Sequence, residues 1–270
     1  MSVKPTAIVT GSARGIGESI VRYLVDAGFA VCINDISANK SLIDKLVNEL
    51  NSSHGKNTAI GVVADVTLPD EVKQMIDQSV KAIGPLTVMI ANAGIAHIAG
   101  SLELTVEDVK NVFNVNFNGV FNCYTAAARQ MIAQGPVPEG TLGYRILAAA
   151  SIASFKPFPT LGHYCATKAA VRAFSQTFAI EMARHKINVN CYAPGIVGTA
   201  MWDLIDEKLG QIEGRPPGET VKKYSTELTA MGRVSVPEDV SKTVVGFLCN
   251  KSSDFVTGQT IVVDGGIVFN

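Results

Sequence analysis

Short apolar runs alternate along the chain with longer segments whose apolar residues recur at helical spacing. The short runs are rich in β-branched residues and apolar on both faces, which predicts strands buried between helices. Seven such runs lie at residues 7–10, 30–34, 59–63, 87–91, 145–150, 188–192 and 260–263. Between them, helices are predicted at residues 15–26, 40–50, 68–83, 105–131, 163–184 and 237–249.

This alternation predicts an α/β fold with a doubly wound, seven-stranded parallel sheet and helices on both faces. Parallel strands need crossover connections, and the predicted helices supply them. Two polar interruptions, at residues 135–143 and 210–220, are interpreted as surface insertions within one domain rather than as linkers. We therefore expect a single domain over residues 1–270.

Composition narrows the range of functions. The 270 residues are 47% apolar, and 23 Lys plus Arg nearly balance 24 Asp plus Glu. Because no strong field of one sign is expected, nucleic acid and membranes are not predicted partners, and a small, nearly neutral molecule fits better. The chain shows no apolar run near the ~20 residues of a membrane span and no apolar leader, so we expect a cytoplasmic protein. The scattered cysteines indicate reduced thiols in the core: Cys32, Cys123, Cys165, Cys191 and Cys249.

A glycine-rich turn follows the first predicted strand. Residues 10–17 read TGSARGIG and lead directly into the first predicted helix. Gly11 permits a tight turn, Gly15 lets the backbone approach a pyrophosphate, and Gly17 lets the helix pack closely on the sheet. The helix N-terminus adds unpaired N–H groups and a positive dipole for an anion. Such a turn also occurs between ordinary strands and helices, so other residues must support a dinucleotide site.

Two residues bear on the choice between NAD and NADP. Asp35 follows the second predicted strand, where a carboxylate accepts hydrogen bonds from the adenosine ribose and repels a 2′-phosphate. Arg14, within the glycine loop, offers a contact to such a phosphate. We predict NAD as the cofactor and keep NADP as the alternative.

Tyr164 and Lys168 form the candidate catalytic pair. They are four residues apart in a predicted helix, hence neighbours on one face, and no other tyrosine has a lysine at this spacing. A phenol titrates near pH 10, so a cation beside it is needed to bring its pKa towards neutrality. Ser151 supplies a hydroxyl at the end of a central strand. A Tyr–Lys pair alone is also common at the edge of amphipathic helices, but this one follows the glycine loop, Asp35 and Ser151 in order.

Together these motifs resemble the short-chain dehydrogenase/reductase family from Thr10 to the end of the chain. The resemblance also rests on Asp65-Val66, Asn92-Ala93-Gly94, Asn116, Pro194-Gly195 and Asp264-Gly265-Gly266. It implies a Rossmann fold and a nicotinamide-dependent oxidoreductase that interconverts a secondary alcohol and a ketone. One departure is Ala91, where the family usually has a second Asn, so a stabilising polar contact is absent.

The resemblance also implies roles for individual residues. Ser151 would donate a hydrogen bond to the substrate oxygen, Tyr164 would transfer the proton, and Lys168 would tune the tyrosine and bind the nicotinamide ribose. Asn116 would hold a water that links Lys168 to solvent. The cofactor would contact Gly11, Arg14, Gly15, Ile16, Gly17, Asp35, Asp65, Val66, Asn92, Ala93, Gly94, Tyr164, Lys168, Pro194, Gly195, Ile196 and Thr199.

The C-terminal third resembles acetoin (diacetyl) reductases, also called 2,3-butanediol dehydrogenases. Bacterial members usually carry polar Gln and Asn in the loop after the catalytic serine, whereas Ile152 and Phe158 stand at the matching positions here. Because Trp202 is also expected near the pocket, a bulkier apolar or cyclic ketone or alcohol is the alternative substrate. His163, next to Tyr164, is a further candidate substrate contact, although a histidine there is also typical of a polar rim.

Three expectations complete the comparison with the family. A substrate lid is expected at about residues 199–230, and the long helices together with the last strand imply a homotetramer. No spacing of His, Cys and Asp resembles a metal site, so none is predicted. A protein that binds a dinucleotide without catalysis is the remaining alternative, but such a protein would be expected to have lost Tyr164, Lys168 or Ser151.

Overall fold

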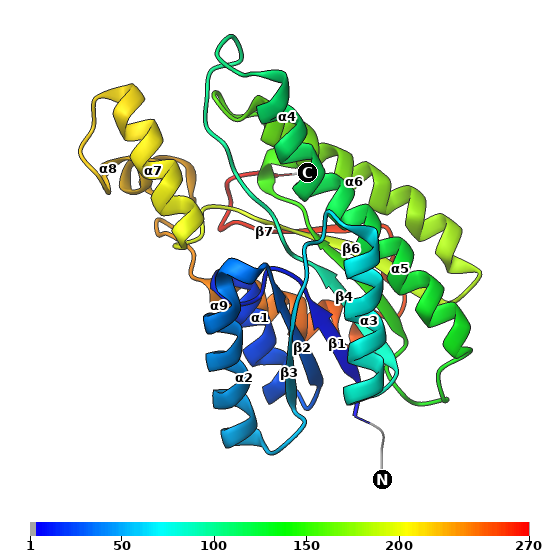
Figure 1. Cartoon of the computed structure of the whole chain (residues 1–270). Coiled ribbons are helices and arrows are strands. Elements are labelled where there is room, and N and C mark those ends of the chain that lie inside the picture. Colours follow the sequence, from blue (N-terminus) through cyan, green and yellow to red (C-terminus); the bar gives the residue numbers. More distant parts are fainter. Residues whose placement is uncertain (1–3, 270) are drawn as a thin grey trace.

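The computed structural model describes residues 4–269 and contains one sheet of seven parallel strands (Figure 1). The strands lie in the order β3-β2-β1-β4-β5-β6-β7, which confirms the predicted fold class. The order reverses between β1 and β4, and the carboxyl ends of strands at such a reversal form a crevice for ligands. Their bounds are β1 Thr6–Val9, β2 Ala30–Asp35, β3 Ala59–Val63, β4 Leu86–Ala91, β5 Tyr144–Ala149, β6 Ile187–Pro194 and β7 Thr260–Val263.

Helices cover both faces of the sheet. One face packs against α1 (Gly15–Asp26), α2 (Lys40–His54) and α9 (Pro237–Thr243). The other packs against α3 (Pro69–Ile83), α5 (Gly119–Gln134) and α6 (Gly162–Ala183). Because apolar side chains of each strand enter both cores, the strands are apolar throughout rather than alternating.

The helix predicted at residues 105–131 contains an irregularity. Helix α4 (Val106–Phe113) begins at a capping box of Thr105 and Asp108 and passes into a π-helical turn at Asn114–Asn118 before α5. The segment predicted as one helix at residues 237–249 likewise changes from α9 to a π-helical turn at Val244–Leu248. Such turns insert an extra residue locally, which hydrophobic periodicity does not reveal.

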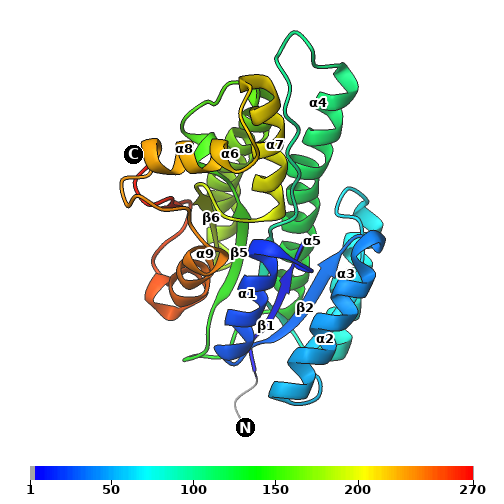
Figure 2. The same cartoon turned by 90° about the vertical axis from the view of Figure 1, so that its left-hand side faces the viewer.

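Residues 199–230 form a pair of helices that lies beyond the carboxyl ends of the strands (Figures 1 and 2). They are α7 (Ala200–Glu213) and α8 (Glu219–Leu228). The buried Asp206 carboxylate accepts hydrogen bonds from the backbone N–H groups of Gly218 and Val221. This single side chain on α7 therefore holds the start of α8 in place.

Two further observations concern the described part of the chain. Within residues 4–269, no helix has both the length and the hydrophobicity needed to cross a membrane. All five cysteines are buried as free thiols.

Candidate active site

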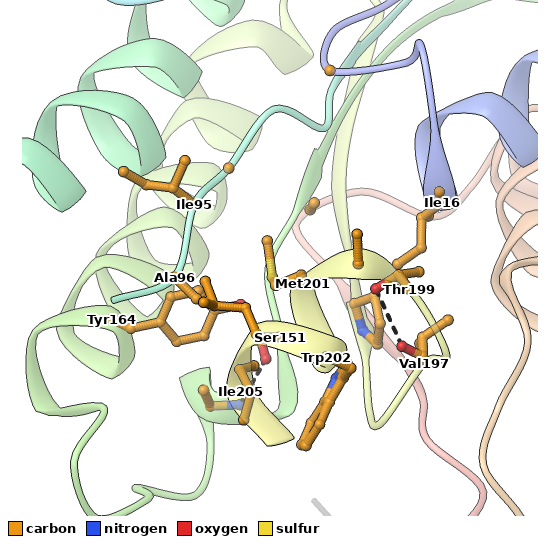
Figure 3. A pocket seen from close by; sticks show the side chains of 18 of the residues that line it. Ile16, Ile95, Ala96, Ser151, Tyr164, Val197, Thr199, Met201, Trp202 and Ile205 are labelled. Atoms are coloured by element: carbon orange, nitrogen blue, oxygen red, sulfur yellow. Dashed lines mark hydrogen bonds between the residues drawn. The ribbon is translucent and has the colours of Figure 1, made fainter. Parts of the chain in front are cut away.

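A cavity of about 950 Å³ opens at the carboxyl ends of the central strands. Its walls come from the glycine loop, the segments after β4, β5 and β6, and the helices α6, α7 and α8. In Figure 3, Ile16, Val197 and Thr199 lie together at one side, and Ser151 and Tyr164 lie at the other. Ligands therefore have access to both the glycine loop and the residues of the Tyr–Lys motif from the same space.

The glycine loop forms a close-fitting turn at the start of α1. Gly11 and Gly15 have φ of 60° and 61°, in the left-handed region that favours glycine. A Cβ on Gly17 would lie 2.4 Å from the Gly11 carbonyl oxygen and 2.7 Å from the amide nitrogen of Asn92. Arg14, the residue that precedes α1, makes no side-chain hydrogen bond to the first turn of this helix. The N–H groups of that turn are therefore available to an anion.

Asn92 joins the glycine loop to the centre of the sheet. Its amide nitrogen donates to the carbonyls of Thr10 and Gly11 at 3.0 and 3.1 Å, and its oxygen accepts from the Tyr192 hydroxyl at 2.9 Å. The preceding Ala91 is buried in the apolar core beneath α5 and α6. Hence the position where the family usually has a second Asn contributes packing here, and Asn92 supplies the polar contacts.

Asp35 lies at the end of β2 and lines the cavity. One carboxylate oxygen accepts from the backbone N–H of Ala13 at 3.2 Å, and the other accepts from Ile36 N–H and the Asn39 amide at 2.9 and 2.8 Å. Arg14 also lines the cavity but is exposed. The carboxylate is thus fixed by its neighbours, whereas the guanidinium lies at the surface.

Ser151, Tyr164 and Lys168 line the same region of the cavity. Ser151 lies two residues beyond the end of β5, and both other residues belong to α6. The Lys168 Nζ lies 5.7 Å from the centre of the Tyr164 ring and donates a hydrogen bond of 2.7 Å to the carbonyl of Ala149. The three residues predicted to act together are therefore neighbours in space.

Burial shifts the pKa values of the Tyr–Lys pair in opposite directions. It raises the pKa of Tyr164 to about 12, although a hydrogen bond with Ser151 opposes this rise. Burial lowers the pKa of Lys168 to about 8. At neutral pH, the tyrosine therefore retains its proton and the lysine remains mostly charged.

Asn116 lies in the π-helical turn between α4 and α5 and is fully buried. Its side-chain oxygen accepts from the Ile95 N–H at 2.8 Å, and its nitrogen donates to the Ile95 carbonyl at 2.9 Å and to the Thr167 hydroxyl at 3.2 Å. A Cβ on Gly94 would lie 3.3 Å from the Asn116 oxygen and 3.5 Å from the Lys168 Nζ. Asn116 thus fixes the Gly94–Ile95 segment, which lies between Asn116 and Lys168.

The remaining predicted residues divide into two groups. His163 does not line the described cavity: it is 5% exposed, and its ring packs edge-on against His97 with 5.4 Å between ring centres. One residue along a helix turns the side chain by about 100°, so His163 points away from the face that carries Tyr164. Residues that do line the cavity include Asp65, Val66, Ala93, Ile152, Phe158, Pro194, Gly195, Ile196, Thr199 and Trp202.

The comparisons with known proteins agree with this geometry. Residues 5–210 match the family model described as short chain dehydrogenase. The chain belongs to the short-chain dehydrogenase family. It is therefore an NAD(P)-dependent alcohol dehydrogenase or ketoreductase, and the family resemblance inferred from the sequence is confirmed.

Relatives of this short-chain dehydrogenase match it over nearly its whole length. It is 40% identical to the L-2,3-butanediol dehydrogenase of Corynebacterium glutamicum, with 98% of each chain covered. It is 37% identical to the diacetyl reductase [(S)-acetoin forming] of Staphylococcus epidermidis, again with 98% of each covered. Among solved structures, a gluconate 5-dehydrogenase from Burkholderia cenocepacia in complex with NADP and tartrate is 31% identical, with a TM-score of 0.83 and coverage of 97% of this chain and 94% of that one.

The cavity of this dehydrogenase suits a dinucleotide. Close packing at Gly17 and the available N–H groups of α1 leave a concave, backbone-lined surface of the kind that holds a pyrophosphate. Asp35 lies at the end of β2, where a ribose hydroxyl would find an acceptor. Within residues 4–269, no group of three or more His, Cys, Asp or Glu side chains is arranged to hold a metal ion.

Sequence reasoning missed the apolar side chains that α7 and α8 contribute to the cavity. These come from two turns of α7 beyond Trp202 and from α8: Ile205, Leu209, Ile212, Tyr224 and Leu228. The residues on α7 recur three or four positions apart, which is the spacing of one helical face. That signal is present in the sequence, but it is hidden by the glycines and prolines that separate the two helices.

Proposed function

We propose that this dehydrogenase uses NAD(H) to interconvert a secondary alcohol and a ketone, with acetoin-type hydroxyketones and diketones among its substrates. The observation that carries the proposal is the position of Ser151, Tyr164 and Lys168 around one cavity beside the glycine loop. The names of the two relatives, a butanediol dehydrogenase and a diacetyl reductase, support the acetoin-type substrates.

In this proposal Ser151 and Tyr164 act on the substrate oxygen. The Ser151 hydroxyl donates a hydrogen bond to that oxygen, and Tyr164 donates its proton to it during ketone reduction. The raised pKa of Tyr164 suits this donor role, because the phenol keeps its proton at neutral pH. When bound, NAD(H) supplies or accepts the hydride at the substrate carbon.

Lys168 and Asn116 support the proton transfer. The charged Lys168 favours the phenolate that Tyr164 must become, so it lowers the barrier to losing the proton. Its hydrogen bond to the Ala149 carbonyl sets the direction of the side chain. Asn116 holds Ile95 in place through two hydrogen bonds, and Gly94 lies between the Asn116 side chain and the Lys168 ammonium group. With a water molecule, Asn116 would connect Lys168 to solvent.

The cofactor would lie along the glycine loop. Asp65, Val66 and the Asn92–Gly94 segment would border the adenosine side, and Tyr164, Lys168 and residues 194–196 with Thr199 the nicotinamide side. We propose NAD rather than NADP because the fixed Asp35 carboxylate would repel a 2′-phosphate. The exposed Arg14 is the residue that would favour NADP.

The test measures reduction of diacetyl and acetoin at 340 nm with NADH and with NADPH. We expect turnover with NADH and a kcat/KM at least about tenfold lower with NADPH, since a repelled phosphate costs more than about 1.4 kcal/mol. Tyr164→Phe should lower kcat by about 10³-fold or more while leaving the Kd for NADH within about threefold. Retained turnover in that variant would contradict the role of Tyr164, and equal use of NADPH would contradict that of Asp35.

We also propose a cytoplasmic homotetramer with a lid at residues 199–230. Exposed apolar side chains on α5 and α6, Phe121 at 44% and Ile180 at 79%, support one subunit contact. The edge strand β7 and the neighbouring Phe255, which is fully exposed, support another. The buried free thiols fit a reducing compartment. Light scattering should give four times the 28.6 kDa chain mass, and a monomeric mass would contradict the tetramer.

A further inference from the structure

The cavity that Ser151 lines continues along one face of α7. Trp202, Ile205, Leu209 and Ile212 all line it, at intervals of three or four residues. At 1.5 Å of rise per residue, this stripe is about 15 Å long. Trp202, the first residue of the stripe, packs in the apolar cluster around Ile152, which directly follows Ser151. The stripe therefore begins near the catalytic serine and continues along α7.

The walls that face this stripe are apolar as well. Phe158 and Leu161, from the segment before α6, line the cavity on one side, and Tyr224 and Leu228 of α8 line it on another. Phe158, Trp202, Tyr224 and Leu228 also pack in the same small apolar cluster around the buried Ile152. A ligand extending along α7 would therefore meet hydrocarbon on several sides.

The apolar lining has a defined far end. The last residue of α7, Glu213, accepts a hydrogen bond of 2.7 Å from the Tyr224 hydroxyl and forms an ion pair of 2.7 Å with Arg215. These polar groups follow directly after Ile212, so the apolar stripe ends there. Its length along α7 is therefore limited to the segment from Trp202 to Ile212.

Two large aliphatic side chains of α7 remain exposed to water where they line the cavity. Leu204 is 40% exposed and Ile212 is 59% exposed. Single exposed aliphatic residues are common, but two on one helix along one cavity mark a surface that an apolar ligand would cover. Covering them is favourable in proportion to the area removed from water.

A four-carbon substrate would use only a small part of this stripe. Its three C–C bonds of about 1.5 Å span no more than about 5 Å, which is roughly one helical turn of α7. We infer that the preferred substrate is a ketone or secondary alcohol with a bulky apolar body, such as a fused ring system, that lies along α7. This inference rests on the proposed oxidoreductase function and specifies its substrate class.

The first test compares ketones of increasing apolar size with NADH as cofactor. Diacetyl, cyclohexanone and the bicyclic 2-decalone serve as probes. We expect kcat/KM to rise from cyclohexanone to 2-decalone by at least tenfold, because each buried methylene is worth about fourfold. The kcat/KM for 2-decalone should also exceed that for diacetyl.

The second test places a polar group in the stripe. Leu209 lies about 10 Å beyond Trp202 along α7, so this test uses the four-ring ketone 5α-androstan-3-one, whose fused rings are about 9 Å long. Leu209→Gln should lower kcat/KM for this ketone at least about fivefold more than kcat/KM for diacetyl, since only the longer body reaches the third turn of α7. Lys208→Gln is the matched control, because Lys208 is the exposed neighbour outside the cavity lining and its replacement should change neither value. The thermal midpoint of each variant shows whether the lid remains folded.

The outcomes separate the two proposals. Absence of NADH-dependent turnover with every ketone would overturn the proposed function and this inference with it. Turnover that favours diacetyl over 2-decalone would overturn the inference alone. So would an equal effect of Leu209→Gln on diacetyl and on 5α-androstan-3-one, because the stripe would then act only on folding or on the catalytic residues.

Discussion

The two ends of the cavity are built from different parts of the chain. At the glycine loop the walls are mainly backbone, and a Cβ on Gly17 has no room. The Asn92 side chain stabilises that end with three hydrogen bonds, to Thr10 and Gly11 in the glycine-rich turn and to Tyr192 in β6. At α7 and α8, the proposed lid, the walls are apolar side chains, and the buried Asp206 carboxylate fixes the start of α8.

This difference suggests a division between reaction and specificity. Backbone walls recognise groups common to every dinucleotide, and they tolerate little change because they depend on close approach. Side-chain walls on a lid can change in size and polarity without disturbing the sheet. We therefore expect the glycine loop to determine cofactor binding, and the side chains of α7 and α8 to determine which substrate is accepted.

The largest effect is expected where the two ends meet, at Lys168. Lys168→Met removes the positive charge beside Tyr164, whose pKa burial already raises to about 12. Alcohol oxidation needs the phenolate, so its rate at pH 8 and saturating NAD should fall by about 10³-fold. Because phenolate is then scarce, the remaining rate should rise about tenfold per pH unit.

The pH dependence of alcohol oxidation by the wild-type enzyme provides the comparison. With a Lys168 pKa of about 8, the lysine is mostly charged below that pH and supports the phenolate there. Lys242→Met, at an exposed position on α9, should reproduce the wild-type profile. If Lys168→Met instead kept the wild-type pH dependence of kcat, Lys168 would only position the cofactor.

The next largest effect tests the backbone-lined end. Gly17→Ala places a Cβ against the Gly11 carbonyl, so the loop must shift, and the Kd for NADH should rise by about 100-fold. Gly246→Ala is the control, because a Cβ there meets nothing within 4 Å. Fluorescence titration of NADH gives the Kd values. Unchanged binding in Gly17→Ala would show that the close fit at Gly17 is dispensable.

The same division between the glycine loop and the α7–α8 end explains which parts of the site could be predicted from the sequence alone. The glycine loop, Asp35 and the Tyr164–Lys168 pair were predicted because local spacing along a strand, turn or helix determines where they lie. The parallel sheet was predicted in the same way, since buried apolar runs alternate with crossover helices. The order of its strands was not predicted, because strand pairing is a long-range contact. Asn116 was identified only through the family resemblance, because nothing in its spacing reveals the π-helical turn or its bonds to Ile95.

The sequence was least informative at the lid and around His163. His163 adjoins Tyr164 in the chain, yet the rotation of α6 turns it towards His97 and out of the cavity. Ile205, Leu209 and Tyr224 meet only through the tertiary arrangement of α7 and α8, which depends on the contact of Asp206 with a segment twelve residues further along. Long-range contacts of this kind leave no local pattern.

The smallest expected effect tests the lid itself. Asp206→Ala leaves the backbone N–H groups of Gly218 and Val221 without their buried acceptor, so α8 should detach more readily from α7. Because α8 lines the ketone side of the cavity, KM for the ketone should rise by about tenfold. The Kd for NADH should stay within about twofold, since the glycine loop keeps its own contacts.

Asp203→Ala is the matched control, because Asp203 is exposed on the same helix and absent from the cavity lining. Steady-state kinetics with a saturating cofactor and NADH titration together separate the two ends of the cavity. If Asp206→Ala weakened NADH binding as much as ketone binding, the lid and the glycine loop would act as one unit. Specificity would then depend on the whole cavity, and replacing lid residues alone would not redirect this dehydrogenase to another ketone.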